Sequence, residues 1–503
     1  MENAASVDRA AGLGGESTAQ AMNRRASFSA SDFPASVAPG RALSRRQFLA
    51  RSAVAGAAAL VPRHVLGGAG QVPPSAKTTL AGIGLGGQGL QNMVAFQAMP
   101  EVQVVAVCDV NREGGGYISW NWSEGREEQR CGREPARRLM DERYAQQQRS
   151  GQYRGCRAYS DYRELLDKED VDAVMIATPD HTHAVITMAA LKRRKHVYCE
   201  KPLTYSVAEA RLVAEAARRA GVATQCGNQG QASEGARLVR EMIAAGAIGA
   251  VREVQVWCPA RFWSWPPWEG RPPDTPPVPP GLDWDLWIGP APYRPYHPAY
   301  HPWTWRNWLD FGTGLLGDLG LHKLSTVFKA LNLGHPVSVE GSATKLSAET
   351  YPLGEIVRFE FPARGSLPPV TLTWYDGGLR PPRPPELEPD EPMRDVIYIG
   401  DQGKIMGERL IPDERMEAYR RPPKTLPRSP GHYQEWIAAC RGGPPAGSNF
   451  PDHAGLLTEV CLLGNIAVRA QKKLLWDGAA LRFTNDQNAN KLLRRDYRAD
   501  WAL

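Results

Sequence analysis

The sequence predicts an α/β protein with a doubly wound parallel sheet first and an α+β domain with a large, mostly antiparallel sheet second. Three observations support this fold class. Between Thr78 and Cys226, short apolar runs alternate with helical stretches, which is the pattern of parallel βαβ units. After residue 228, strand-like runs follow one another at hairpin-like spacing between proline-rich loops. The 503 residues exceed what one hydrophobic core organises, so we expect a leader at 1–76 and domains at 77–227 and 228–503.

Composition and charge exclude several classes of function. The chain is 42% apolar and 23% charged, as in an ordinary globular protein. Its net charge of +6 is modest, and the arginines form no compact basic stripe, so nucleic-acid binding is not indicated. The eight cysteines include no CxxC pair, which disfavours a zinc site.

The leader carries a candidate export signal. Arg45-Arg46 is followed by Phe48-Leu49 and a weakly apolar run at 52–61, which is typical of a twin-arginine signal. The alternative is a basic amphipathic tail. Because the apolar run is too short for a stable membrane anchor, we expect export to the periplasm, with cleavage between residues 66 and 76. The length of the leader suggests a start at Met22.

A glycine-rich turn follows the first predicted strand. Thr78–Ile83 is apolar, and the chain then runs through Gly84-Leu-Gly-Gly-Gln-Gly89 into a helical stretch at 90–99. This order of strand, glycine turn and helix suits a dinucleotide, whose pyrophosphate needs close backbone approach and a helix amino end. The turn supplies five candidate cofactor-binding residues: Gly84, Gly86, Gly87, Gln88 and Gly89.

An acidic residue ends the second predicted strand. Asp109 follows the apolar run at 102–107 and lies 20 residues after Gly89, where a carboxylate accepts from the adenine ribose hydroxyls. This spacing favours NAD. Arg112 could instead meet a 2′-phosphate, which leaves NADP open.

The strand predicted at 171–177 ends in a polar segment, Thr178-Pro179-Asp180-His181-Thr182-His183. An Asp-His-x-His pattern could bind a metal, but the sequence offers no third ligand at a suitable place. We therefore interpret it as a loop under the nicotinamide, with Asp180 or Thr182 capping a helix at 184–194.

Lys201 lies at a junction between two predicted elements. Tyr198-Cys-Glu-Lys-Pro202 ends a short strand that starts near residue 196, because proline cannot continue the ladder. Ser206 to Glu209 then forms a capping box that opens the next helix. Ligands bind at such carboxyl ends of strands. The alternative is a surface lysine in a turn.

The second predicted domain contains an aromatic segment that leads into a histidine motif. Nine of the fifteen tryptophans fall between Trp257 and Trp308, and they could form core, an oligomer interface or a stacking platform for sugars. Asp318 and His322 are four residues apart, so on a helix they share one face. A carboxylate beside an imidazole suits a general base, and a purely structural pair is the alternative. Strands are predicted at 251–257, 337–344, 355–361, 370–375 and 396–399.

Taken together, the glycine turn, Glu200-Lys201-Pro202 and Gly317-Asp318-x-x-x-His322 resemble the Gfo/Idh/MocA family of NAD(P)-dependent oxidoreductases. The resemblance runs from about residue 78 to 503 and is greatest to an exported branch of that family. Shared motifs include Pro179-Asp-His, Gly227-Asn-Gln-Gly, Leu282-Asp-Trp, Tyr300-His-Pro, Trp374-Tyr-Asp-Gly-Gly and Gly447-Ser-Asn-Phe.

The resemblance implies a Rossmann domain, a second domain whose open sheet serves a homodimer or homotetramer, and a site between them. It implies that Lys201 holds the reacting hydroxyl, that His322 is the general base, and that Asp318 is a substrate or histidine partner. Thr182 and Leu321 depart from the family, where tryptophan and cysteine are common. Further cofactor-binding candidates are Thr178, Pro179, His183, Glu200, Lys201 and Asn228, and substrate-binding candidates are Tyr300, Trp305, Arg306 and Asp318.

The expected function is hydride transfer between a tightly bound NAD, or NADP, and a secondary hydroxyl of a sugar, polyol or glycoside. One alternative is an NAD-dependent glycosidase that oxidises its sugar transiently and then eliminates and hydrates. A second alternative is a non-catalytic sugar-binding protein. No metal ion, nucleic acid or stable membrane anchor is expected.

Overall fold

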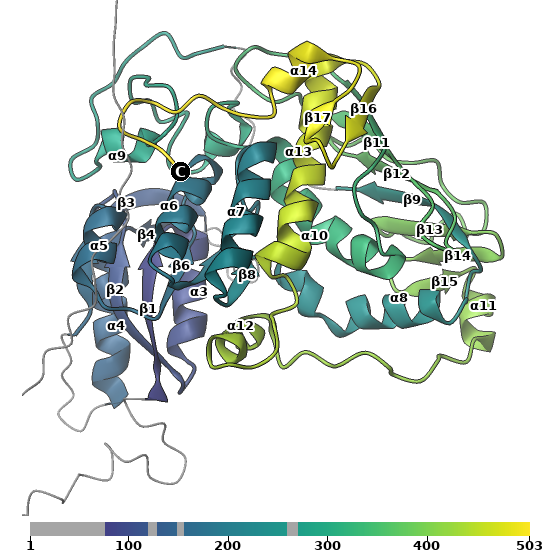
Figure 1. Ribbon diagram of the computed structural model, residues 1–503, viewed down its shortest axis with the longest axis horizontal. Helices are drawn as coiled ribbons and strands as arrows, with labels where there is room; N and C mark the ends of the chain where they lie inside the picture. Colours follow the sequence, from purple (N-terminus) through teal and green to yellow (C-terminus); the bar gives the residue numbers. More distant parts are fainter. Residues whose placement is uncertain (1–75, 119–127, 148–154, 259–269) are drawn as a thin grey trace, which may run out of the picture. The chain divides into compact units, whose positions relative to one another are not determined.

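The computed structural model describes residues 76–118, 128–147, 155–258 and 270–503 (Figure 1). The predicted leader and its twin-arginine signal lie outside these residues. Within the described parts of the chain, no helix is long and apolar enough to cross a membrane.

Six parallel strands form the first sheet, in the order β5-β2-β1-β6-β7-β8. The strands are β1 (Thr78–Ile83), β2 (Val102–Cys108), β5 (Arg157–Tyr159), β6 (Ala173–Ile176), β7 (His196–Cys199) and β8 (Thr224–Cys226). The connecting helices are α3 (Gly87–Gln97), α4 (Arg133–Gln147), α5 (Tyr162–Lys168), α6 (Asp180–Lys192) and α7 (Val207–Ala220). A separate hairpin, β3 (Gly114–Ile118) and β4 (Glu128–Cys131), branches off after β2.

Apolar side chains cover both faces of this sheet. Along β6, Met175 packs with Met93 of α3 in one core, whereas Val174 packs with Val185 of α6 in another. Successive strand residues point to opposite faces, so a strand that is apolar throughout needs helices on both sides. The doubly wound parallel sheet is therefore confirmed.

Helix α6 begins earlier than predicted. Pro179 is its N-cap residue and makes no side-chain capping bond, and Asp180 is already the first helical residue. The prediction that Asp180 or Thr182 caps a helix at 184 is thus wrong, because the polar residues after Pro179 are themselves helical. The predicted capping box of α7 is confirmed, with Ser206 and Glu209 bonding each other's backbone.

Nine strands form the second sheet, in the order β15-β14-β13-β9-β12-β11-β10-β16-β17. Only the β9–β12 pair is parallel, so the mostly antiparallel sheet is confirmed. The strands are β9 (Val251–Trp257), β10 (Ser338–Ala343), β11 (Glu355–Phe361), β12 (Val370–Tyr375), β13 (Val396–Gly400), β14 (Gly403–Met406), β15 (Arg409–Ile411), β16 (Leu474–Asp477) and β17 (Arg482–Phe483).

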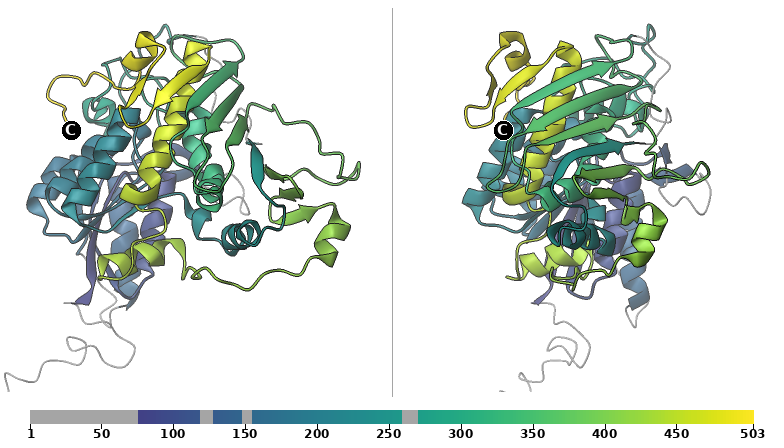
Figure 2. Two further views of the ribbon diagram at one scale, coloured as in Figure 1. Left: turned by 45° about the vertical axis from the view of Figure 1, so that its right-hand side comes forward. Right: turned by 90° about the vertical axis from the view of Figure 1, so that its right-hand side faces the viewer.

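Helices α10 and α13 lie against this sheet (Figure 2). The helices of this region are α8 (Glu234–Ala244), α9 (Trp284–Ile288), α10 (Gly314–Leu331), α11 (Asp413–Ala418), α12 (His432–Cys440), α13 (Gly455–Ala470) and α14 (Gln487–Lys491), with short helical turns η2 (Gln229–Ala232), η3 (Thr304–Asn307) and η4 (Phe450–Ala454).

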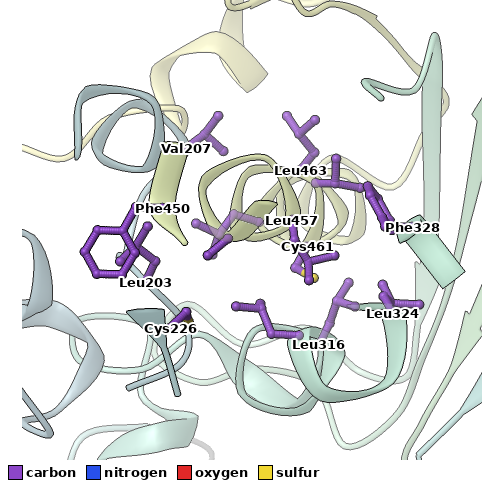
Figure 3. Close-up of a cluster of buried hydrophobic side chains, with 14 of the residues drawn as sticks. Leu203, Val207, Cys226, Leu316, Leu324, Phe328, Phe450, Leu457, Cys461 and Leu463 are labelled. Atoms are coloured by element: carbon purple, nitrogen blue, oxygen red, sulfur yellow. The ribbon is translucent and has the colours of Figure 1, made fainter. Parts of the chain in front are cut away.

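One hydrophobic cluster joins the two sheets. It runs from Ile176 of β6 through α7, α13 and α10 to Val357 of β11. Figure 3 shows its centre, where Leu457 and Cys461 of α13 lie between Phe450 and Phe328. The two sheets therefore hold a common core, which fixes α10 relative to the first sheet.

The segment at 431–450 returns to the first sheet. Trp436 of α12 is fully buried in that sheet's second core, beside Phe96 and Tyr198. The backbone N–H of Cys226 donates to the carbonyl oxygen of Ser448 at 2.9 Å. Residues 431–450, which follow strands β9 to β15 in the chain, thus complete the core of the first sheet.

Candidate active site

A cavity opens at the carboxyl ends of the first sheet's strands. It lies where the strand order reverses between β1 and β6, the position at which open α/β sheets bind ligands. Residues that follow four of the strands line it: Gly84 after β1, Asp109 after β2, Thr178 after β6 and Lys201 after β7. The wall opposite these strand ends comes from 286–306, α10 and the C-terminal Trp501.

The glycine turn has no room for side chains. Gly84 has a φ of +85°, and a Cβ there would lie 2.5 Å from the backbone nitrogen of Thr178. A Cβ on Gly89 would lie 1.9 Å from the carbonyl oxygen of Gly84, so the amino end of α3 lies directly on the turn. Gly86, Gly87 and Gln88 line the cavity, where the free N–H groups at the start of α3 can meet an anion.

Asp109 is bound by the turn itself. Its carboxylate accepts from the backbone N–H of Leu85 at 2.6 Å and of Asn111 at 2.8 Å. Burial nevertheless raises the pKa of Asp109 to about 6. Arg112, which the sequence analysis names as a possible partner for the 2′-phosphate of NADP, is exposed. A glycine-rich backbone cradle, with a carboxylate beyond it, fits a dinucleotide.

Lys201 forms an ion pair with Asp318 inside the cavity. The ammonium bonds Asp318 Oδ1, and Arg306 Nε lies 3.5 Å from Asp318 Oδ2. Burial would raise the pKa of Asp318, but the Lys201 and Arg306 charges outweigh it and lower that pKa. Their side chains are at most 13% exposed, so the group forms a charged cluster largely shielded from water.

His322 follows Asp318 by one turn of α10 but is not among the residues that line the cavity. Burial and the nearby Lys201 ammonium lower the pKa of His322 to about 3, although the Asp318 carboxylate acts to raise it. The imidazole is therefore close enough to feel both charges, and it is neutral at neutral pH.

The polar segment after β6 is occupied by internal bonds. A ring nitrogen of His181 lies 2.9 Å from the Trp287 carbonyl oxygen, and the two ring nitrogens of His183 lie 2.6 and 2.8 Å from the carbonyl oxygens of Pro202 and Thr178. Burial lowers the pKa of His181 to about 3 and that of His183 to about 4. Within the described ranges, no cluster of three or more His, Cys, Asp or Glu side chains could hold a metal.

Two other predicted cofactor residues, Glu200 and Asn228, are buried and form hydrogen bonds with different partners. Glu200 lines the cavity and accepts from Asn92 Nδ2 at 2.9 Å and Gln229 Nε2 at 3.0 Å. Burial raises the pKa of Glu200, although these two bonds act to lower it. Asn228 lies outside the lining and donates to the Leu321 carbonyl oxygen at 3.3 Å.

Aromatic side chains form the wall opposite the strand ends. Arg306 lies over the rings of Trp303 and Trp305, at 4.1 and 4.3 Å from their centroids, and all three line the cavity. Trp305 and Arg306 are predicted substrate residues. Asp318, also predicted, lines the cavity as well, whereas the fourth predicted substrate residue, Tyr300, lies in the aromatic core between Trp308 and Phe311 and does not line it.

Sequence reasoning missed several lining residues. Tyr117 of the hairpin reaches the cavity, where its hydroxyl lies 3.1 Å from His301 Nε2, and a Cβ on Gly86 would lie 3.2 Å from its ring. Trp501 arrives from the chain's end. The Tyr300-His-Pro motif was a signal for His301, whereas nothing local marks Tyr117 or Trp501.

Two models of one family match adjacent parts of the chain. Residues 114–228 match "Oxidoreductase family, NAD-binding Rossmann fold" (GFO_IDH_MocA), and residues 233–359 match "Oxidoreductase family, C-terminal alpha/beta domain" (GFO_IDH_MocA_C2). These matches contain Lys201 in the first part and Asp318 and His322 in the second.

Curated relatives match over shorter stretches. The 1,5-anhydro-D-fructose reductase of Ensifer adhaerens is 41% identical over 86 residues, 17% of this chain and 26% of the relative. The myo-inositol 2-dehydrogenase of Thermotoga maritima is 32% identical over 93 residues, 18% of this chain and 28% of the relative. The matched stretch thus spans only about a quarter of these relatives' length.

Solved structures share the fold over nearly their whole length. The WlbA dehydrogenase of Bordetella pertussis, in complex with NADH and UDP-GlcNAcA, aligns with a TM-score of 0.51 at 15% identity, covering 80% of this chain and 99% of that one. Levoglucosan dehydrogenase, in complex with NADH and L-sorbose, aligns with a TM-score of 0.50 at 15% identity, covering 79% and 98%. By these two adjacent matches, residues 114–228 and 233–359 are similar to the NAD-binding and C-terminal domains of the Gfo/Idh/MocA family of oxidoreductases.

Proposed function

We propose that this protein is an NAD-dependent oxidoreductase that moves a hydride between bound NAD and a secondary hydroxyl of a sugar, polyol or glycoside. One observation carries the proposal: the Lys201–Asp318 pair and the glycine turn line the same cavity, although they come from distant parts of the chain. The aromatic wall around Arg306 suits the CH faces and hydroxyls of a carbohydrate.

The chain's own groups control the alcohol in this reaction. NAD, when bound, accepts the hydride. The carbinol C–H bond breaks with its electron pair, the O–H bond gives up its proton, and a carbonyl group forms. Lys201 holds the oxygen and stabilises the negative charge that develops on it, and Asp318 holds the ammonium in place. His322 is the proton acceptor that the sequence motif predicts.

We further propose that the protein is exported with its cofactor bound. The support is the twin-arginine pattern at Arg45-Arg46, together with a cavity that is lined by Tyr117 beside the glycine turn and by Trp501 from the end of the chain. Free dinucleotide is not expected outside the cytoplasm, so turnover there requires a cofactor that stays bound. Fractionation of cells that express the native chain and an Arg45→Lys/Arg46→Lys variant tests the export.

The central experiment is mass spectrometry of small molecules released by denaturing the purified protein, followed by turnover assays with a panel of sugars, polyols and aryl glycosides. We expect NAD to be released and a ketose product to form. Release of the aglycone without net oxidation would indicate the redox-neutral glycosidase. A protein that binds the sugars but turns over none of them would refute catalysis.

A further inference from the structure

The residues that line the cavity give a bound dinucleotide a direction. Across the first sheet, Asp161 follows β5, Asp109 follows β2, Gly86 follows β1, Thr178 follows β6 and Lys201 follows β7, and all five line the cavity. The pyrophosphate belongs at the glycine turn and the adenine ribose at Asp109. The adenine base therefore belongs on the β5 side of the turn, away from Lys201.

Trp501 lies on this side of the cavity. Its ring centroid is 6.4 Å from that of Tyr162, the first residue of α5, and both side chains line the cavity. The guanidinium carbon of Arg163 lies 5.0 Å from the centroid of the same indole. Val110, which follows Asp109, also lines the cavity. The β5 side of the site thus offers the aromatic and apolar surface on which a purine base stacks.

Segment 493–503 brings this indole to its place, and the first part of the segment is fixed to α7. The backbone N–H of Ala208 donates to the Leu493 carbonyl oxygen at 3.0 Å, and the Tyr497 hydroxyl donates to Glu209 Oε1 at 2.6 Å. In Figure 1 the yellow trace of the segment runs from α14 toward α9. The segment is thus attached to a helix that covers the first sheet.

Arg498 fixes the second part of the segment to α9. Its guanidinium pairs with Asp285, and its Nε donates to the Gly289 carbonyl oxygen at 3.0 Å. The backbone N–H of Trp501 then donates to the Arg498 carbonyl oxygen at 3.1 Å. A Cβ on Gly289 would lie 3.7 Å from Trp501 Cη2, so the indole lies against this backbone. Contacts from α5 and α9 therefore hold the indole in one orientation.

Trp501 is neither a fully buried core residue nor part of the wall beside Asp318. Its side chain is only partly buried, so part of the indole remains available to a ligand. The wall beside Asp318 contains Trp303 and Trp305, whose rings stack on Arg306. Those rings lie near the group that holds the reacting hydroxyl, whereas the ring contacts of Trp501 are to α5.

We propose that Trp501 stacks on the adenine base of bound NAD and that segment 493–503 positions it there. The assignment rests on the proposed function, because it requires the dinucleotide that the glycine turn would receive. It adds a cofactor-binding residue that no motif of the sequence marks. Removing an aromatic ring that stacks on a base should weaken binding roughly tenfold.

Three variants test the stacking and the positioning. Trp501→Ala removes the ring, Trp501→Phe keeps an aromatic face, and Arg498→Ala removes the side-chain contacts that hold the segment to α9. Arg494→Ala is the matched control, because Arg494 is an exposed residue of the same segment and does not line the cavity. Affinities for NAD and for ADP-ribose are measured by calorimetry on protein freed of bound nucleotide, and thermal unfolding shows whether each variant is folded.

ADP-ribose carries the adenine base and the pyrophosphate but no nicotinamide. We expect Trp501→Ala to bind NAD and ADP-ribose more weakly by the same factor of roughly ten, and Trp501→Phe to recover most of this loss. Arg498→Ala should weaken both ligands as well, and the Arg494→Ala control should bind them as wild type does.

Wild-type affinity for ADP-ribose in a folded Trp501→Ala variant would overturn the assignment, since the indole would then contact the nicotinamide half, the sugar or no ligand at all. Failure of the wild type to bind ADP-ribose would overturn it too. If Trp501→Ala does not fold, unchanged affinities in Arg498→Ala decide against the proposal.

These affinities are measured without a sugar, so they judge Trp501 even if no ketose product forms. A missing product together with the expected affinities refutes only the proposed oxidation of a sugar. Sugar oxidation with unchanged affinities in the variants refutes only the adenine contact.

Discussion

The Gly89→Ala substitution tests whether the glycine turn is the dinucleotide site. The added Cβ would lie 1.9 Å from the Gly84 carbonyl oxygen, whereas ordinary contact begins at 3.4 Å. The turn cannot give way easily, because the Gly84 N–H donates to the Cys108 carbonyl and the Leu85 N–H donates to Asp109. Helix α3 must therefore move away from the turn.

Overpacking of this kind costs about 1–3 kcal/mol. The cost falls where the start of α3 meets the turn, so we expect most of it to appear in cofactor binding. At about 1.4 kcal/mol per factor of ten, NAD affinity should fall roughly 5- to 100-fold. Thermal stability should fall as well, since the same overlap strains the apo protein.

Titration calorimetry with NAD, run beside thermal unfolding, measures both effects. Gly334→Ala is the matched control, because a Cβ there meets nothing within 4 Å. It should leave NAD affinity unchanged. Wild-type affinity in a folded Gly89→Ala variant would refute the reasoning and place the dinucleotide elsewhere.

Three further predictions concern the rest of the site. Lys201→Met should lower kcat by roughly 10²- to 10⁴-fold while NAD still binds, and it should lower the unfolding temperature because Asp318 loses its partner; unchanged turnover would sink the assignment. His181, whose folded pKa of about 3 lies below the ordinary value of 6.5, is neutral in the native state, so stability falls as pH drops below about 6.5, by about 1.4 kcal/mol per pH unit. Urea unfolding at several pH values gives the change of the unfolding free energy with pH, which measures the protons taken up on unfolding. This uptake should be smaller by one proton in His181→Asn than in wild type. An identical pH dependence in the two proteins would contradict the burial argument. Trp501→Ala should weaken NAD or substrate binding roughly tenfold without lowering the unfolding temperature much, as measured by the same calorimetry.

The predictable elements were those with local signals. The strand at Thr78–Ile83 and the capping box at Ser206 need only neighbouring residues, and both appear as predicted. Helix α6 was predicted four residues late, because the polar run from Asp180 was interpreted as a loop although its side chains are buried inside the fold. Short strands such as β16 carry too little pattern of their own and depend on the neighbour with which they pair.

The same distinction applies to the site. Lys201 and Asp318 stand in recognisable motifs, and the structure joins them directly. Tyr117 and Trp501 reach the cavity through the path of the whole chain, which no local pattern encodes.

Because residues 431–450 return to the first sheet, the core of that sheet is not contained within residues 77–227. A fragment that stops at residue 227 would leave an aromatic socket empty where Trp436 belongs, and would leave the Cys226 N–H without its acceptor. We expect that this core is completed only after residues 431–450 have been synthesised. A chimera that exchanges the nucleotide-binding domain of one relative for that of another at residue 227 should therefore have an incomplete core. Exchanging residues 431–450 together with that domain should restore the core.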